Sequence, residues 1–101
     1  MPPKVIFPEV YSFEESIAIL NKYKNQLTKE QYENTKSVIG NHAIESIYLN
    51  ERDIKILVDM DVHHLSSEEA IQRARERGEF WTFIYYSSFY SMFFKYFIFI
   101  P

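Results

Sequence analysis

Hydrophobic and polar residues recur with the period of an α-helix through most of the first 79 positions of the chain. Four such runs each open with a residue that can cap a helix, followed three positions later by Glu, Gln or Asp. These capping residues are Ser12, Thr28, Asn50 and Ser66. No alternating strand pattern of useful length competes with them. The sequence therefore predicts an all-α fold, a small bundle of three to four short helices.

The second run predicts a helix over about 28–47 with two different faces. One face carries an apolar stripe made of Tyr32, Ile39, Ala43 and Ile47. Asn34, Asn41 and Glu45 fall on the other side together with Val38. A helix packed through one stripe is suited to presenting the Glu45 carboxylate from the other. From spacing alone, a solvated glutamate on an ordinary amphipathic helix is the commoner case.

The third run, ERDIKILVDMD, carries apolar residues on two sides of its helix. Ile54, Leu57 and Val58 lie on one side, and Ile56 and Met60 lie on another. Two apolar faces on a short helix are typical of contact on both faces. The helix then lies either at the centre of a small bundle or between its own domain and a partner.

The fourth run, EEAIQRARERG, has a narrow apolar stripe and meets a C-terminal stop at Gly78. Arg73, Arg75 and Arg77 in this run are candidate contacts for phosphate or an acidic partner. Several glutamates surround them, however, and such mixed charge is typical of a solvated helix face. We therefore assign no site to these arginines.

The two ends of the chain differ from this helical body, which covers 12–79. Residues 1–11 contain three prolines and predict an irregular arm. Residues 80–101 are rich in Phe and Tyr, and Lys95 is their only charged residue. The tail has the length of a membrane span, but its serines and its scattered aromatic residues make a poor one. Its role stays open between a poor anchor, a sticky segment covered by a partner, and an accidental extension, which composition favours.

Composition excludes several kinds of chemistry. The chain has no cysteine and only two glycines, which rules out thiolate metal sites and disfavours glycine-rich phosphate loops. His42, His63 and His64 lack the spacing at which a helix chelates a metal, and we interpret them as loop or surface residues. We therefore expect no enzyme, no catalytic residue, no metal and no cofactor.

Charge and the amino end bear on partners and location. With 14 acidic and 11 basic residues, the net charge of -3 disfavours nonspecific binding to nucleic acid, and we expect no nucleic-acid partner. The first residues, MPPKVIFPEV, lack the continuous apolar region of a secretory signal. We expect a cytoplasmic protein that is not held in a membrane.

One long segment resembles a known family. It runs from Ser37 to Arg77 and reads SVIGNHAIESIYLNERDIKILVDMDVHHLSSEEAIQRARER. This segment resembles the small antitoxins of the VbhA type, which inhibit Fic-domain toxins. In that family an inhibitory helix carries Ser or Thr, three variable residues, Glu, and then Gly or Asn, and two further helices follow. Here the motif falls on 41–46, NHAIES, with Asn41 in place of the hydroxyl residue and Ser46 in place of Gly or Asn.

The resemblance implies a mechanism as well as a fold. Fic proteins transfer AMP from ATP to a hydroxyl side chain of a target, and one of their arginines binds the γ-phosphate of the nucleotide. The antitoxin's glutamate pairs with that arginine and occupies the space the γ-phosphate needs. Carried over, Glu45 is the inhibitory residue, and Asn41 and Ser46 support it. Contacts with the toxin, in a heterodimer or larger complex, are expected from Val38, Ile44, Ile47, Ile54, Leu57 and Met60.

Two other functions remain open at this point. The first is a helical adaptor or small regulator that binds another protein through the apolar faces of the third helix. The second is a small membrane-anchored protein that uses residues 80–100.

Overall fold

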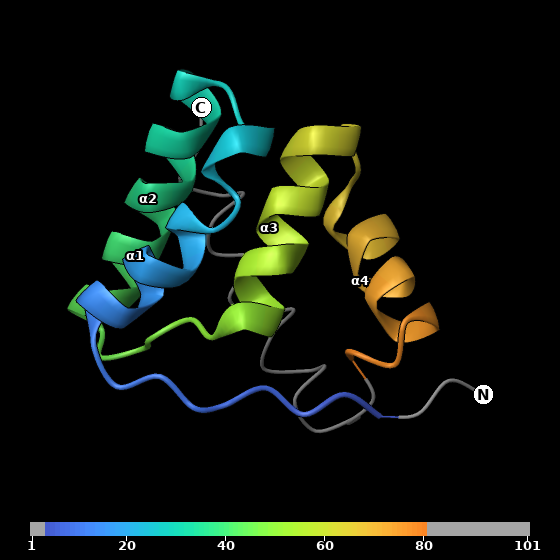
Figure 1. Ribbon diagram of the computed structural model, residues 1–101, viewed down its shortest axis with the longest axis horizontal. Helices are drawn as coiled ribbons and strands as arrows, with labels where there is room; N and C mark the ends of the chain where they lie inside the picture. The colour runs from blue at the N-terminus through green and yellow to red at the C-terminus, as the bar shows by residue number, and fades with distance from the viewer. Residues whose placement is uncertain (1–3, 81–101) are drawn as a thin grey trace.

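The computed structural model describes residues 4–80, in which four short α-helices and one 3₁₀ helix follow one another (Figure 1). The elements are α1 (Phe13–Asn21), the 3₁₀ helix η1 (Lys24–Gln26), α2 (Lys29–Ile44), α3 (Glu51–His63) and α4 (Ser67–Glu76). No strand occurs between residues 4 and 80, so the all-α prediction is confirmed for this part of the chain. The expectations for the aromatic tail fall, apart from Phe80, outside the described residues.

All four predicted capping residues cap helices. Thr28 and Ser66 form complete capping boxes, in which Gln31 and Glu69 each accept a hydrogen bond from the backbone of the capping residue. Ser12 accepts from the Glu15 backbone NH, as expected. The Glu15 carboxylate, however, accepts from the backbone NH of Tyr11 rather than completing a box with Ser12. This bond joins the arm to the start of α1.

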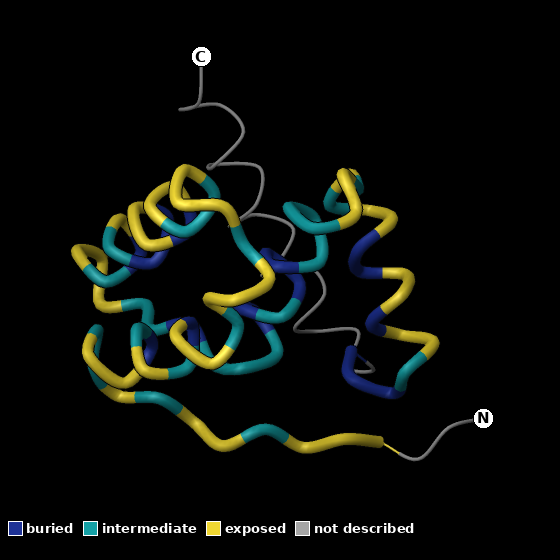
Figure 2. The backbone as a smooth tube through the Cα atoms, turned by 45° about the horizontal axis from the view of Figure 1, so that its top comes forward, coloured by how far each residue is buried: buried dark blue, intermediate teal, exposed yellow. Residues whose placement is uncertain are grey.

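α3 lies at the centre of the fold and contacts each of the other three helices (Figure 1). Its residues Ile54 and Ile56 are both fully buried, and Leu57 and Val58 are almost so. The two apolar faces of this helix therefore face the helices on its two sides, which is the bundle-centre alternative. α4 buries one face, which carries Ala70, Ile71 and Ala74, and exposes the other (Figure 2).

The arm and the end of α4 meet at the edge of the bundle. The backbone NH of Val5 donates to the carbonyl oxygen of Gly78 at 2.9 Å, and the Lys55 ammonium lies 5.7 Å from the centre of the Phe7 ring. Residues 4–11 otherwise have no regular secondary structure, so the predicted irregular arm is confirmed over these residues. Phe80 is 2% exposed and packs in the core, with the Arg52 guanidinium 5.1 Å from its ring centre.

Candidate functional site at the end of α2

α2 ends earlier than its apolar pattern predicted, and the way it ends shapes the candidate site. The last helical residue is Ile44, Glu45 is the C-cap, and Ser46 and Ile47 lie beyond the helix. The backbone NH of Ile47 donates to the carbonyl of His42 at 2.9 Å, and that of Ser46 donates to the carbonyl of Ala43 at 2.9 Å. This pair of bonds is the Schellman arrangement, which satisfies the last carbonyls of a helix. The prediction of a helix to about residue 47 was therefore wrong at its end.

Ser46 adopts the backbone conformation that a Schellman turn requires. Its φ is 62°, in the left-handed region that non-glycine residues seldom occupy. Glycine reaches this region without steric cost, and asparagine tolerates it better than most side chains do. Serine therefore occupies a backbone position that glycine or asparagine would take with less strain.

Glu45 is placed at the surface by this turn. Its side chain is exposed, and so are those of Asn41, one helical turn earlier, and Ser46. The prediction that Asn41 and Glu45 share a solvent-facing side of the helix agrees with this placement. Val38, which the pattern assigned to the same side, is 3% exposed and belongs to the core.

The six residues expected to contact a toxin occupy very different environments. Val38, Ile54 and Leu57 pack inside the domain with at most 5% of their surface exposed. Ile47 and Met60 are partly buried against the same core. Val38, Ile54 and Leu57 therefore pack in the core of the domain and do not face a partner as expected. Ile54 and Leu57 do so because the fold buries both sides of the central helix α3. Ile44 differs from all of these, since 83% of its surface is exposed.

Buried polar contacts hold the turn that carries Glu45. His42 is 9% exposed, which corrects its interpretation as a loop or surface residue. Its Nδ1 lies 2.8 Å from the carbonyl oxygen of Val38 and donates to it, because a carbonyl oxygen can only accept. From α1, the buried Ser16 hydroxyl donates to the carbonyl of Leu49 at 2.8 Å. The His42 contact lies within the last turns of α2, and the Ser16 hydrogen bond joins the connection between α2 and α3 to α1.

A buried carboxylate lies just after this connection. Asp53, in the first turn of α3, is 7% exposed and accepts two hydrogen bonds from the Arg52 guanidinium, at 3.1 and 3.0 Å. Burial raises the pKa of Asp53, while the charges of Arg52 and, to a smaller extent, His42 act in the opposite direction. Sequence reasoning missed this group, because only the fold shows that His42 and Asp53 lie near each other.

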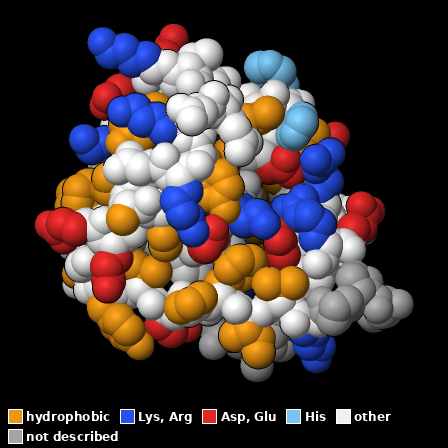
Figure 3. Space-filling model, viewed as in Figure 1, with side chains coloured by type: hydrophobic (Ala, Val, Ile, Leu, Met, Phe, Trp, Pro, Cys, Tyr) orange, Lys and Arg blue, Asp and Glu red, His pale blue; other side chains and the backbone are white. Residues whose placement is uncertain are grey.

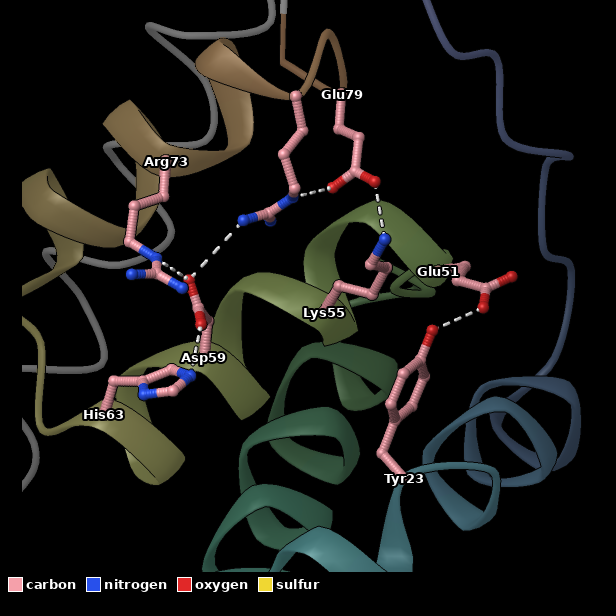
Figure 4. Close-up of polar contacts among 8 residues, drawn as sticks. Tyr23, Glu51, Lys55, Asp59, His63, Arg73 and Glu79 are labelled. Carbon is pink, nitrogen blue, oxygen red and sulfur yellow. Dashed lines mark hydrogen bonds and ion pairs between the residues drawn. The ribbon is translucent and has the colours of Figure 1, made fainter.

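Arg73 of α4 and Arg77, just after the helix, pair with carboxylates of the same domain (Figure 4). Asp59 on α3 lies 2.9 Å from Arg73 and 3.8 Å from Arg77. Arg77 also donates to Glu79 at 2.8 Å, and the buried Glu79 pairs with Lys55 as well. These contacts favour a structural role for Arg73 and Arg77 over the phosphate-binding alternative. They join α4 to α3 at the edge away from α2.

Residues 4–80 contain no cluster of three side chains arranged to hold a metal ion. Within the same range, every helix is too short or too polar to cross a bilayer. Comparison with known proteins yielded no match to any family model, curated protein or solved structure.

Proposed function

We propose that this chain is the antitoxin of a toxin-antitoxin pair, and that it binds a Fic-domain toxin and blocks AMP transfer. In this proposal Glu45 pairs with the toxin arginine that would otherwise hold the γ-phosphate of ATP. The chain acts as an inhibitor and not as a catalyst. Asn41 and Ser46 support the carboxylate from the same end of α2.

The observation that carries the proposal is the end of α2. Glu45 is an exposed residue at a helix terminus, followed by a residue with φ of 62°. This is the local structure that a motif of glutamate followed by glycine or asparagine favours. The agreement supports the resemblance at the position where Ser46 departs from the motif.

The chemistry at this position suits the proposed role. A carboxylate forms charge-assisted and often bidentate hydrogen bonds with a guanidinium. Such bonds gain most when the carboxylate is already positioned, because less conformational freedom is lost on binding. The Schellman bonds of α2 and the hydrogen bond from Ser16 to Leu49 fix the backbone on both sides of Glu45. A rigid base of this kind supports delivery of one carboxylate to a defined point.

The direct test is an AMP-transfer assay with the Fic-domain protein encoded beside the gene for this chain. Glu45→Ala is expected to weaken inhibition by roughly tenfold to a hundredfold, the range expected for losing a hydrogen bond between charged groups. Glu33→Ala is the matched control, because Glu33 is also an exposed glutamate on α2. The control is expected to inhibit as the wild-type chain does.

Retained inhibition by Glu45→Ala would show the proposed mechanism to be wrong. If this chain binds a partner that has no Fic active site and does not bind a Fic protein, it is instead a helical adaptor. Circular dichroism of each variant shows that lost inhibition does not come from lost folding.

A further inference from the structure

The exposed apolar residues of the described chain are confined to one edge. Within residues 4–80, the large hydrophobic side chains that are exposed are Val5, Ile6, Tyr11 and Ile44. Single exposed apolar residues are ordinary on a protein surface. These residues, however, all belong to the arm or to the end of α2, and Ile6, Tyr11 and Ile44 each expose more than three quarters of their surface.

The fold brings the arm and the end of α2 to the same side of the molecule. α1 and α2 run in opposite directions, and a Cβ added at Gly40 would lie 3.6 Å from the Phe13 ring. The start of α1 therefore lies beside the last turns of α2. Tyr11 precedes Phe13 by two residues, and Ile44 follows Gly40 by about one helical turn. Figure 1 shows the arm along this lower edge, and Figure 3 shows hydrophobic side chains gathered there.

The stretches of chain that contain Tyr11 and Ile44 carry acidic side chains and no lysine or arginine. Residues 5–21 contain no Lys or Arg, and neither do residues 37–51. The same segments carry the exposed carboxylates of Glu9, Glu14 and Glu15 beside that of Glu45. Exposed apolar side chains in stretches that also carry exposed carboxylates match a partner surface with apolar and basic residues.

We propose that Tyr11 and Ile44, with Ile6, form the surface through which this chain docks on the Fic-domain toxin. The inference rests on the proposed function and deepens it, because it assigns affinity to residues other than Glu45. The Tyr11, Ile44 and Ile6 side chains contact an apolar site on the toxin, beside the basic residues that receive the carboxylates. Docking on this edge brings Glu45, the neighbour of Ile44, to the nucleotide site.

The test measures binding and inhibition separately. Tyr11→Ser and Ile44→Ser are titrated by calorimetry against the purified Fic-domain protein encoded beside this chain, and AMP transfer is assayed with each variant at saturation. Each is expected to weaken binding roughly tenfold or more, as truncation of a buried interface anchor does. Full inhibition at saturation is expected to remain, because Glu45 is present. Gln72→Ser, at an exposed position of α4, is the control and is expected to bind as wild type.

The outcomes separate this inference from the proposed function. Wild-type affinity in both Tyr11→Ser and Ile44→Ser would overturn the docking surface while leaving the role of Glu45 intact. Full inhibition by Glu45→Ala would overturn the proposed function. Failure of the wild-type chain to bind the Fic protein would overturn both. Self-association of the wild-type chain that Tyr11→Ser abolishes, measured by sedimentation, would assign the edge to a second copy and overturn the inference.

Discussion

At the scale of single residues, Ser46 has the least common backbone conformation near the candidate site. Its left-handed φ costs a residue with a Cβ roughly 1 kcal/mol relative to glycine. Gly78 stands at the equivalent place after α4, with φ of 76°, and closes a Schellman arrangement of its own. The same type of turn thus occurs twice in this chain, once with glycine at the left-handed position and once with serine.

Replacing Ser46 by glycine is therefore expected to stabilise the fold. We predict that Ser46→Gly raises the free energy of unfolding by about 1 kcal/mol in chemical denaturation, since it removes the steric cost of the turn. Ser37→Gly is the matched control, because Ser37 is exposed within α2, where glycine forms helix less well than serine and is expected to destabilise the fold by about 0.5 kcal/mol. Equal destabilisation by both variants would show that the turn after Glu45 is not left-handed in solution.

Glu51 shows how one charged residue ties two helices together. Hydrogen bonds from Lys22 and Tyr23 lower the pKa of Glu51, and burial acts against them to a smaller extent. The Tyr23 hydroxyl lies 2.6 Å from the carboxylate. A pKa lowered by folding means that the ionised Glu51 stabilises the fold above its unfolded pKa, and that this stabilisation is lost as the pH falls through its folded pKa.

The pH dependence of Glu51→Gln follows from that sign. The variant is expected to be less stable than wild type at neutral pH, because it loses the charge that pairs with Lys22. The gap between the two is expected to close as the pH falls below about 4, where unpaired glutamates take up a proton. Thermal unfolding of both proteins, measured from neutral pH to below pH ~4, checks this prediction. A gap that stays constant down to the lowest pH would contradict the assigned pairing.

At the scale of helices, the sequence predicts where each one begins far better than where α2 ends. Helix starts have local signals, and the caps at Thr28 and Ser66 form through side chains three residues away. The end of α4 is signalled by Gly78 in the same local way. The end of α2 carries no glycine, and its apolar pattern continues to Ile47. Only the backbone of the folded chain shows the turn at Ser46.

Gly40 lies inside α2, next to the Phe13 ring of α1. An added Cβ would meet the Phe13 ring at 3.6 Å, an ordinary contact distance, and α2 is helical on both sides of it. We therefore predict that Gly40→Ala stabilises the fold by about 1 kcal/mol in denaturant unfolding, because alanine favours the helix. Destabilisation would mean that α1 and α2 approach more closely than this.

At the scale of the whole molecule, the candidate site depends on parts of the chain that lie far apart in sequence. Periodicity predicts an all-α fold and an exposed Glu45. It does not predict that Val38, Ile54 and Leu57 all pack in one core, because the apolar pattern of each helix is compatible with packing against several other elements. Nor does it show that the arm lies at the same edge as Ile44, since this depends on how α1 packs against α2.

The exposed glutamates of the arm and of α1 lead to a prediction about the salt dependence of binding. Binding to a basic partner surface is expected to weaken as ionic strength rises, because salt screens exposed charges. Glu9→Gln combined with Glu14→Gln is expected to reduce both the affinity and its salt dependence in calorimetry. Glu68→Gln, at an exposed position of α4, is the control. Affinity that does not change with salt would show that the carboxylates of these glutamates do not face the partner.

The most direct measurement of the central claim is the affinity of the Fic-domain protein for ATP when it is saturated with this chain. Wild type is expected to weaken ATP binding strongly, because the Glu45 carboxylate occupies the arginine that the γ-phosphate needs. The Glu45→Ala chain, still bound, is expected to leave ATP affinity close to that of the toxin alone. Equal and undiminished ATP binding in both complexes would contradict the account.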